Sequence, residues 1–374
     1  MKKLVLFCSF VIFTTNCKTS YEPDVPPSLL SYLVVDGFLN NSNDSTFIRL
    51  SHLVKLDSTP AGPGESGAQI SIEDIPGNSL YNFIELGKGL YTLPSLSLDL
   101  NTSYRLRIKI KNGMEYLSDS LVPQYTPPID SVGWTKTDHG VTIYCNTHDA
   151  STKPKYYRWD YIETYQYHAQ FYSRLIYQNQ DVQPRDTPIY YCWRTNYSKQ
   201  LLLASSERLS EDLIYQFPLR QIDQNNIELS MKYSILVHQY TESQEAYRYL
   251  QNLKKISEEI GSFWDAQPTQ LTGNIHAVNN NAEPVLGFLT ICNMRSTRIF
   301  ISNNDVAPWI WGTTCPRTLV GRRPDSLRAA FGNGFMLPIE FYNSSRESAV
   351  WGALPECVDC RLFGGVLTKP GFWP

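Results

Sequence analysis

Residues 104–121, YRLRIKIKNGMEYLSDSL, contain two strand-like runs on either side of Asn112-Gly113. The first run, Tyr104 to Ile110, alternates apolar and charged side chains, and the second runs from Glu115 to Leu121. Asn-Gly between such runs is the strongest short-range signal for a β-hairpin, because a type I′ turn needs positive φ at both central residues. The sequence therefore predicts an antiparallel hairpin here.

Similar short runs fill the sequence before this hairpin. They are separated by Gly, Pro, Asn and Ser, which favour turns. The runs are Tyr32 to Gly37, Thr46 to Leu50, Ala68 to Glu73 and Leu80 to Leu86. About seven short strands in this length predict an immunoglobulin-like or transthyretin-like β-sandwich. We place this domain at 31–125, with the proline-containing segment Pro123 to Pro128 as its end.

Residues 129–374 are expected to form a larger β-rich domain with one long helix inserted. The predicted helix spans about 242–260, where Thr241 and Gln244 form a capping box and Gly261 can end the helix. A shorter helix is predicted from about Ser210 to Gln216. The predicted fold class is therefore mainly β.

The densest aromatic stretch is 156–168, YYRWDYIETYQYH. At the two-residue period of a strand, alternate side chains share one face. That face contains Tyr157, Trp159, Tyr161, Glu163, Tyr165 and Tyr167. If it is exposed, it could bind a sugar or a protein partner; if it is covered, it forms the core, which is the commoner arrangement.

Glu163 is the one charged residue on this aromatic face. A carboxylate on a buried face needs a partner, and Arg194 is a candidate. Alternatively, a β-bulge near Thr164 turns the carboxylate outward. A glycosidase pair of Asp160 and Glu163 is also conceivable, but residues three apart on a strand face opposite sides.

Among the eight cysteines, we interpret a set of four as disulfide-bonded, because an exported chain meets an oxidising compartment. The set is Cys192, Cys315, Cys357 and Cys360. These four allow three connectivities, which sequence cannot distinguish. A four-thiolate zinc site, or a redox pair at Cys357 and Cys360, is the alternative. Cys145 shares a strand face with Val141 and Ile143 and is expected to be a buried thiol.

The N-terminus has the features of a secretory signal. Lys2 and Lys3 precede the apolar run Leu4 to Phe13, which is shorter than the roughly 20 residues that span a bilayer. Cys17 then follows, as in a bacterial lipobox, where the thiol carries a lipid. We predict a signal peptide at 1–16, and a lipid anchor at Cys17 with a tether over 17–30.

The sequence lacks the signals of several classes of function. The net charge of −3 and the pI near 6.1 argue against a nucleic-acid partner. No His-Glu-x-x-His, Gly-x-Ser-x-Gly, P-loop or dinucleotide motif is present, so neither a metal nor a cofactor is predicted. We interpret Asn146-Thr147-His148-Asp149 as a turn, and we expect Phe372 or Trp373 to pack on the second domain.

Segments along the whole mature chain together resemble a known family. They are Tyr21 to Asp24, Leu33 to Gly37, Pro128 to Val132, Tyr156 to Trp159, Cys192 to Thr195, Lys232 to Val237, Gln270 to His276, Cys357 to Cys360 and Lys369 to Trp373. The chain resembles a Bacteroidota family of outer-membrane lipoproteins classed as domain of unknown function 4249. The resemblance implies a gene beside a TonB-dependent receptor, and it brings no catalytic residues.

These observations predict a lipid-anchored accessory or binding protein of the outer membrane that takes part in TonB-dependent nutrient uptake. We expect it to be non-enzymatic, with its membrane face, periplasmic or cell-surface, left open. One alternative is a surface hydrolase of glycans or peptides. The other is a structural lipoprotein of envelope assembly, which predicts apolar surface patches and no pocket.

Overall fold

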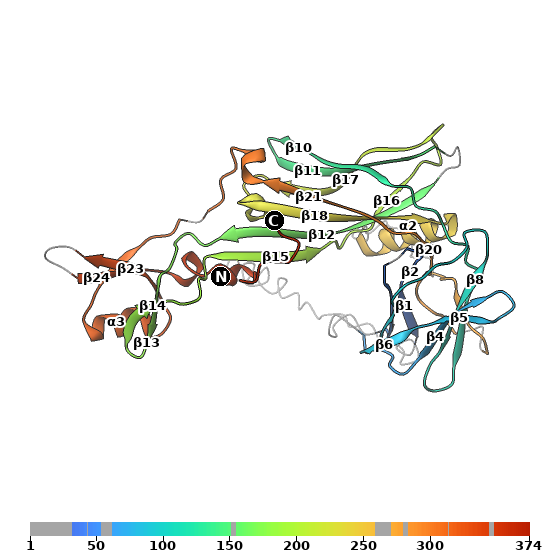
Figure 1. Ribbon diagram of the computed structural model, residues 1–374, viewed down its shortest axis with the longest axis horizontal. Helices are drawn as coiled ribbons and strands as arrows, with labels where there is room; N and C mark the ends of the chain where they lie inside the picture. The colour runs from blue at the N-terminus through green and yellow to red at the C-terminus, as the bar shows by residue number, and fades with distance from the viewer. Residues whose placement is uncertain are drawn as a thin grey trace, which may run out of the picture.

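A computed structural model describes residues 32–42, 44–53, 62–150, 155–258, 271–279, 283–312, 314–343 and 348–374. The predicted signal peptide, Cys17, the tether and Gly261 lie outside these residues. The described chain is mainly β and forms an N-terminal, a central and a C-terminal unit along one long axis (Figure 1). None of the described helices has the length and apolar character needed to cross a bilayer.

The N-terminal unit is built from two sheets that share a core. The first sheet has the strand order β1 (Leu33–Gly37), β3 (Thr46–His52), β7 (Leu90–Leu93) and β6 (Ile84–Gly87). The second has the order β19 (Ile275–Ala277), β9 (Glu115–Ser118), β8 (Tyr104–Lys109), β4 (Gln69–Asp74) and β5 (Ser79–Asn82). The residues predicted as one strand, Leu80 to Leu86, are thus divided between β5 and β6, which belong to different sheets.

The predicted hairpin is present as β8 and β9, but its turn differs from the type I′ expectation. Only Gly113 has a positive φ, of 90°. The Gly113 amide donates to the Ile110 carbonyl at 2.9 Å, and the Asn112 side chain accepts from the Met114 amide at 2.9 Å. A three-residue loop that ends in a left-handed glycine has this geometry and needs positive φ at one position only.

The N-terminal core also contains residues from much later in the chain. β19 pairs with β9, and β20 (Ile291–Cys292) runs parallel to β2 (Leu39–Asn40). Ile275, Leu289 and Ile291 are buried in the same core as Leu33 and Ile48. The predicted division at 125–129 is therefore wrong in one respect, because 275–277 and 285–292 return to complete the first unit.

The central unit is a sandwich of a short sheet and a long sheet. The short sheet contains β10 (Ile129–Thr137), β11 (Gly140–Asp149) and β17 (Asp212–Asp223). The long sheet has the order β15 (Tyr191–Tyr197), β12 (Tyr156–His168), β18 (Lys232–Glu242) and β21 (Arg295–Ser302), with β16 (Leu202–Ser205) beside β12. The helix predicted at 210–216 is wrong: these residues enter β17, where Ile214, Leu219 and Ile222 reach the core.

The long helix is confirmed as α2 (Gln244–Glu258). Its cap lies two positions after the predicted one, because the Ser243 hydroxyl, rather than that of Thr241, accepts the Ala246 amide at 3.1 Å. Thr241 instead belongs to the end of β18. The interpretation of 146–149 as a turn is also wrong, since these residues continue strand β11.

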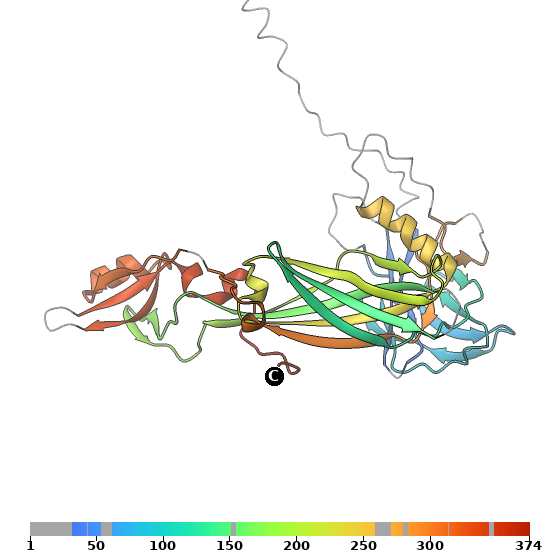
Figure 2. The same cartoon turned by 90° about the horizontal axis from the view of Figure 1, so that it is seen from above.

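The C-terminal unit lies at the far end of the molecule from β1 (Figures 1 and 2). Its sheet has the order β22 (Thr318–Gly321), β24 (Ser348–Ala353) and β23 (Leu337–Asn343), and α3 (Pro324–Phe331) packs on it through Leu327 and Phe331. The hairpin of β13 (Leu175–Gln178) and β14 (Asp181–Pro184) joins this core. Short 3₁₀ turns complete the described chain: η3 (Ile227–Leu229), η4 (Asn303–Val306), η5 (Pro355–Cys357) and η6 (Cys360–Phe363).

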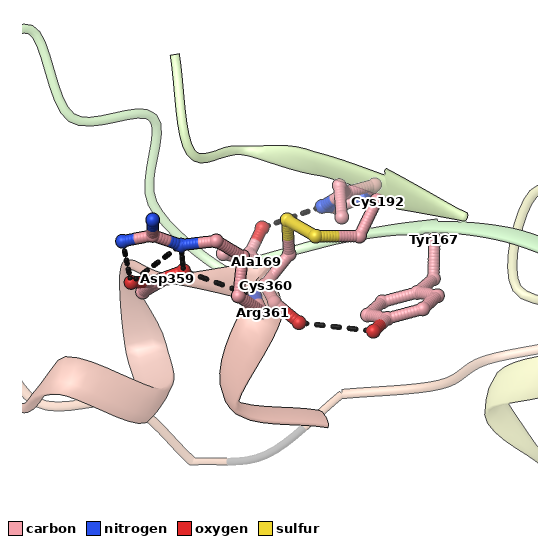
Figure 3. The surroundings of a disulfide bond; sticks show 7 residues. Tyr167, Ala169, Cys192, Asp359, Cys360 and Arg361 are labelled. Atoms are coloured by element: carbon pink, nitrogen blue, oxygen red, sulfur yellow. Dashed lines mark hydrogen bonds and ion pairs between the residues drawn. A yellow bond between two sulfur atoms is a disulfide. The ribbon is translucent and has the colours of Figure 1, made fainter. Parts of the chain in front are cut away.

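Two disulfides use the four predicted cysteines. Cys192 of β15 pairs with Cys360 of η6, and Cys315 pairs with Cys357. Next to the first bond, the Tyr167 hydroxyl donates to the Cys360 carbonyl at 2.9 Å (Figure 3). Because each sulfur is bonded to a distant partner, the zinc and redox-pair alternatives are wrong for these residues. The predicted docking of the C-terminus is confirmed, as Trp373 is 6% exposed and contacts Phe300 edge-on.

Candidate functional site: the interdomain groove

The aromatic face of β12 is the core of the central unit. Tyr157, Trp159, Tyr165 and Tyr167 are at most 2% exposed, and Tyr161 is half-buried. The rings face the short sheet, where Trp159 stacks on Phe217 with 4.6 Å between ring centroids. The prediction of a ligand or partner face at these residues is therefore wrong, because the facing sheet covers it.

Glu163 is buried on this face with three hydrogen-bond donors around it. The carboxylate accepts from Arg220 Nε at 3.1 Å, the Tyr233 hydroxyl at 2.8 Å and Asn196 Nδ2 at 3.1 Å. Arg194, the predicted partner, instead donates to the Phe363 carbonyl at 3.0 Å. No bulge interrupts β12 near Thr164, since its register with β15 and β18 is continuous there.

The opposite face of β12 contributes to a groove between the N-terminal and central units. This interdomain groove has a volume of about 740 Å³. Its lining contains residues of β1, of α2, of the segment 286–288, and of the outer face of the long sheet. In Figure 1, α2 lies beside the junction of the two units. The groove is thus formed where the returning segment joins both units.

The floor of the groove is centred on Arg158 of β12. Its Nε donates to Glu242 Oε1 at 2.7 Å, and its other end lies 3.6 Å from Asp160 Oδ2. The guanidinium also lies 3.8 Å from the centroid of the Tyr240 ring. Phe38, from the N-terminal unit, contacts that ring edge-on at 4.8 Å. Charge pairing and cation–π contact therefore hold Arg158 in place.

The electrostatics of the floor follow from burial and from these pairs. Burial lowers the pKa of Arg158, but Glu242 and its other anionic partners outweigh that effect and leave the pKa raised. Burial raises the pKa of Tyr240, and Asp160, which accepts its hydroxyl at 2.8 Å, adds to this. Arg158 stays cationic and Tyr240 stays neutral near pH 7. One guanidinium thus faces two carboxylates, of which Asp160 keeps 36% of its side chain exposed.

The walls of the groove are apolar. On α2, Leu250 and Leu253 are half-buried, and the Tyr249 ring packs on Phe288 with 5.3 Å between centroids. The combination of apolar walls and a floor with excess negative charge suits a polypeptide segment that carries an apolar residue and a Lys or Arg. No group of three His, Cys, Asp or Glu side chains in the described residues could hold a metal ion.

The sequence contained a partial signal for this site. Arg158 and Asp160 alternate with the aromatic residues of β12, so strand periodicity places both on the face opposite Tyr157 and Glu163. Asp160 and Glu163, conceivable from sequence as a glycosidase pair, lie on two different faces of the strand, as their spacing of three residues predicted. Phe38 and α2 could not be assigned to the groove from sequence, because tertiary packing alone brings them there.

The chain thus has the form of an elongated, mainly β protein with a groove between two of its units. It belongs to the family described as Domain of unknown function (DUF4249), whose model matches residues 18–298. The match includes both units that form the groove. It ends before Cys315, so Cys357 to Cys360 and Lys369 to Trp373 lie beyond the matched residues.

No curated protein matches the chain. Among solved structures, trypsin-activated α2-macroglobulin from Escherichia coli is similar at 8% identity and a TM-score of 0.20, over 60% of this chain and 15% of that one. A cycloalternan-degrading enzyme from Trueperella pyogenes has 9% identity and a TM-score of 0.15, over 72% of this chain and 32% of that one. The chain therefore spans less than a third of either protein, and these scores bear on neither fold nor function.

Proposed function

We propose that this protein is a lipid-anchored, non-enzymatic binding subunit of the outer membrane that serves a TonB-dependent nutrient-uptake system. Cys17 carries the lipid and 18–30 is the tether. The N-terminal unit, with an immunoglobulin-like or transthyretin-like strand layout, acts as a spacer. The interdomain groove receives an exposed segment of the receptor, and this groove is the observation that carries the proposal.

The chemistry of the groove supports a peptide occupant. Leu250, Leu253 and Phe288 offer apolar contact area, which supplies most of the free energy of a small interface. Asp160 lies at the floor with part of its carboxylate exposed, so it can pair with a Lys or Arg of the bound segment. The occupant is therefore a receptor loop with an apolar residue close to a cationic one.

The same groups argue for binding over hydrolysis. A glycosidase needs one carboxyl group that is free to donate a proton and a second that acts as nucleophile or base. Here both Asp160 and Glu242 are paired with Arg158, so neither carboxyl group is free for either role. A purely structural lipoprotein is expected to lack a pocket, whereas the groove is a large one.

The test is co-purification of the tagged full chain, extracted from membranes in detergent, with mass spectrometry of what remains bound. We expect a TonB-dependent receptor to co-purify with the wild-type protein. The Asp160→Arg variant should recover at least tenfold less of this receptor. Asp325→Arg, the same charge change at a side chain 91% exposed on the C-terminal unit, is the matched control. Thermal unfolding of each variant checks that it folds.

A second arm tests the anchor. In the Asp160→Arg background, which removes docking to the receptor, Cys17→Ser should move the protein from the membrane fraction to the soluble fraction, because the lipid is then its remaining attachment. Recovery of the wild-type protein without any such receptor would refute the docking proposal, and equal recovery with Asp160→Arg would exclude the groove as the docking site. Retention of the Cys17→Ser, Asp160→Arg double variant in the membrane fraction would refute the anchor alone.

A further inference from the structure

The outer face of the short sheet is a second surface, on the other side of the central sandwich from the groove floor. Within the described residues, no helix or strand covers this face of β10, β11 and β17 (Figures 1 and 2). It presents Ser131 and Gly133 of β10, Tyr144 and Asn146 of β11, and Tyr215 of β17. All five are exposed or half-buried.

Tyr144 lies across this face above Gly133. A Cβ built on Gly133 would come within 2.7 Å of both Cζ and Oη of the Tyr144 ring. The φ of Gly133 is not in the left-handed region, so the backbone conformation does not require glycine there. The glycine instead makes room for the ring to rest on the sheet with its other side turned outward.

Polar side chains around the ring are held by one another. Asn146 Nδ2 donates to Ser131 Oγ at 2.9 Å, and Asn146 Oδ1 accepts the Gln216 amide at 2.6 Å. His148 Nδ1 lies 2.7 Å from Asp130 Oδ2. At the other end of the face, the Thr142 hydroxyl donates to the Gln221 side chain. These groups are preorganised, which lowers the entropy lost when a ligand binds.

We propose that this surface, centred on Tyr144, binds a neutral oligosaccharide. The outward side of the ring offers the flat π-face on which the C–H side of a sugar ring packs. The fixed amide, hydroxyl and imidazole–carboxylate groups can exchange hydrogen bonds with sugar hydroxyls, and Tyr215, 71% exposed, extends the aromatic surface along β17.

The charge of the surface selects between ligand classes. The Asp130 carboxylate is paired with His148, and among the described residues that share this face with Tyr144 between Thr142 and His148 there is no Arg or Lys. A polyanion or a phosphate would require cationic partners, which this surface does not offer. The inference goes beyond the proposed function, because it uses the opposite side of the sandwich and needs no receptor.

The test is native affinity electrophoresis of the full chain in detergent, through gels that contain one polysaccharide each. The probes are soluble neutral polymers of glucose, mannose and xylose, with polygalacturonate as the charged comparison. We expect at least one neutral polymer to retard the wild-type protein, with a several-fold larger apparent Kd for Tyr144→Ala. Tyr144→Phe keeps the ring and should retain most of the retardation.

Gly133→Ala is the decisive second variant. The added methyl displaces only the far end of the Tyr144 ring, so the protein should fold with an unchanged Tm and yet lose retardation. Phe335→Ala, 66% exposed on the C-terminal unit, is the control and should behave as wild type. The proposal is overturned if no neutral polymer retards the wild-type protein, or if Tyr144→Ala is retarded as much as the wild type. It is also overturned if polygalacturonate retards the wild-type protein as strongly as the neutral polymers do.

Discussion

Arg220 of β17 donates from Nε to the Glu163 carboxylate of β12 at 3.1 Å, across the interior of the central sandwich. The same guanidinium donates from Nη2 to Glu228 Oε1 at 2.7 Å. Burial raises the pKa of Glu228, and the negative charge of the nearby Glu163 raises it further. The short sheet thus supplies the charge that allows an acidic residue on the aromatic strand to be buried.

Glu163→Ala is expected to lower the free energy of unfolding by about 3 kcal/mol. The substitution removes the acceptor of Arg220 Nε and leaves the fully buried Tyr233 hydroxyl without its partner. Urea denaturation followed by circular dichroism measures the change. Arg194→Ala is the control and should cost less than about 1 kcal/mol, since it removes one hydrogen bond. A Glu163→Ala protein as stable as Arg194→Ala would contradict the buried network.

Removal of the Cys192–Cys360 bond by the double change to Ala should destabilise the attachment of the C-terminal segment. A disulfide contributes about 2–5 kcal/mol when it closes a long loop, and this one joins residues 168 apart. Limited proteolysis should therefore cut after residue 303 earlier than in the wild type, while the N-terminal core resists. Cys145→Ala, which removes a buried free thiol, should leave the cleavage order unchanged. If the N-terminal core and the C-terminal segment were cleaved at the same rate, the disulfide would not act locally on the C-terminal segment.

Trp373→Ala should destabilise the protein by about 3 kcal/mol, because it removes a large buried aromatic side chain. Trp373 is 6% exposed against Phe300, whereas its neighbour Phe372 is 44% exposed and lies over Arg298. Phe372→Ala is therefore the matched control, with an expected loss of about 1 kcal/mol or less. The two can be compared by thermal unfolding, and equal losses would show that the docking of Trp373 is unimportant.

The pKa of His148 should lie above its ordinary value near 6.5, because the hydrogen bond and the charge of Asp130 favour the imidazolium form. A raised folded-state pKa means that the contribution of the pair is present below pH 6.5 and is lost as pH rises through the folded-state value. NMR titration of the ring protons should detect this. Asp130→Asn should bring the pKa back toward 6.5, and Asp138→Asn should leave it unchanged. A wild-type value at or below 6.5 would exclude the pair in solution.

Local patterns predicted those parts of the fold in which neighbours along the chain determine the structure. The hairpin at 104–121, the strand at 156–168 and the helix α2 were all found from periodicity and turn residues. The failure at 210–216 has a physical cause: these residues enter β17, whose pairing with β11 overrides weak helix signals. The strand character of 146–149 was missed because Asn146 and His148 lie on the outer sheet face and the buried Thr147 is also polar, so the segment looks like a loop.

By itself, the sequence determined the mainly β class, the strand periodicity that buries the Tyr157 face, and which cysteines form disulfides. Each of these depends on residue type and on spacing over a few positions. Tertiary structure alone decided that Cys192 pairs with Cys360, that Arg220 neutralises Glu163, and that 275–277 and 285–292 complete the first unit. These contacts join residues far apart in the chain, and many such pairings satisfy the same local pattern. The packing of sheets and turns within each unit selects one of these pairings.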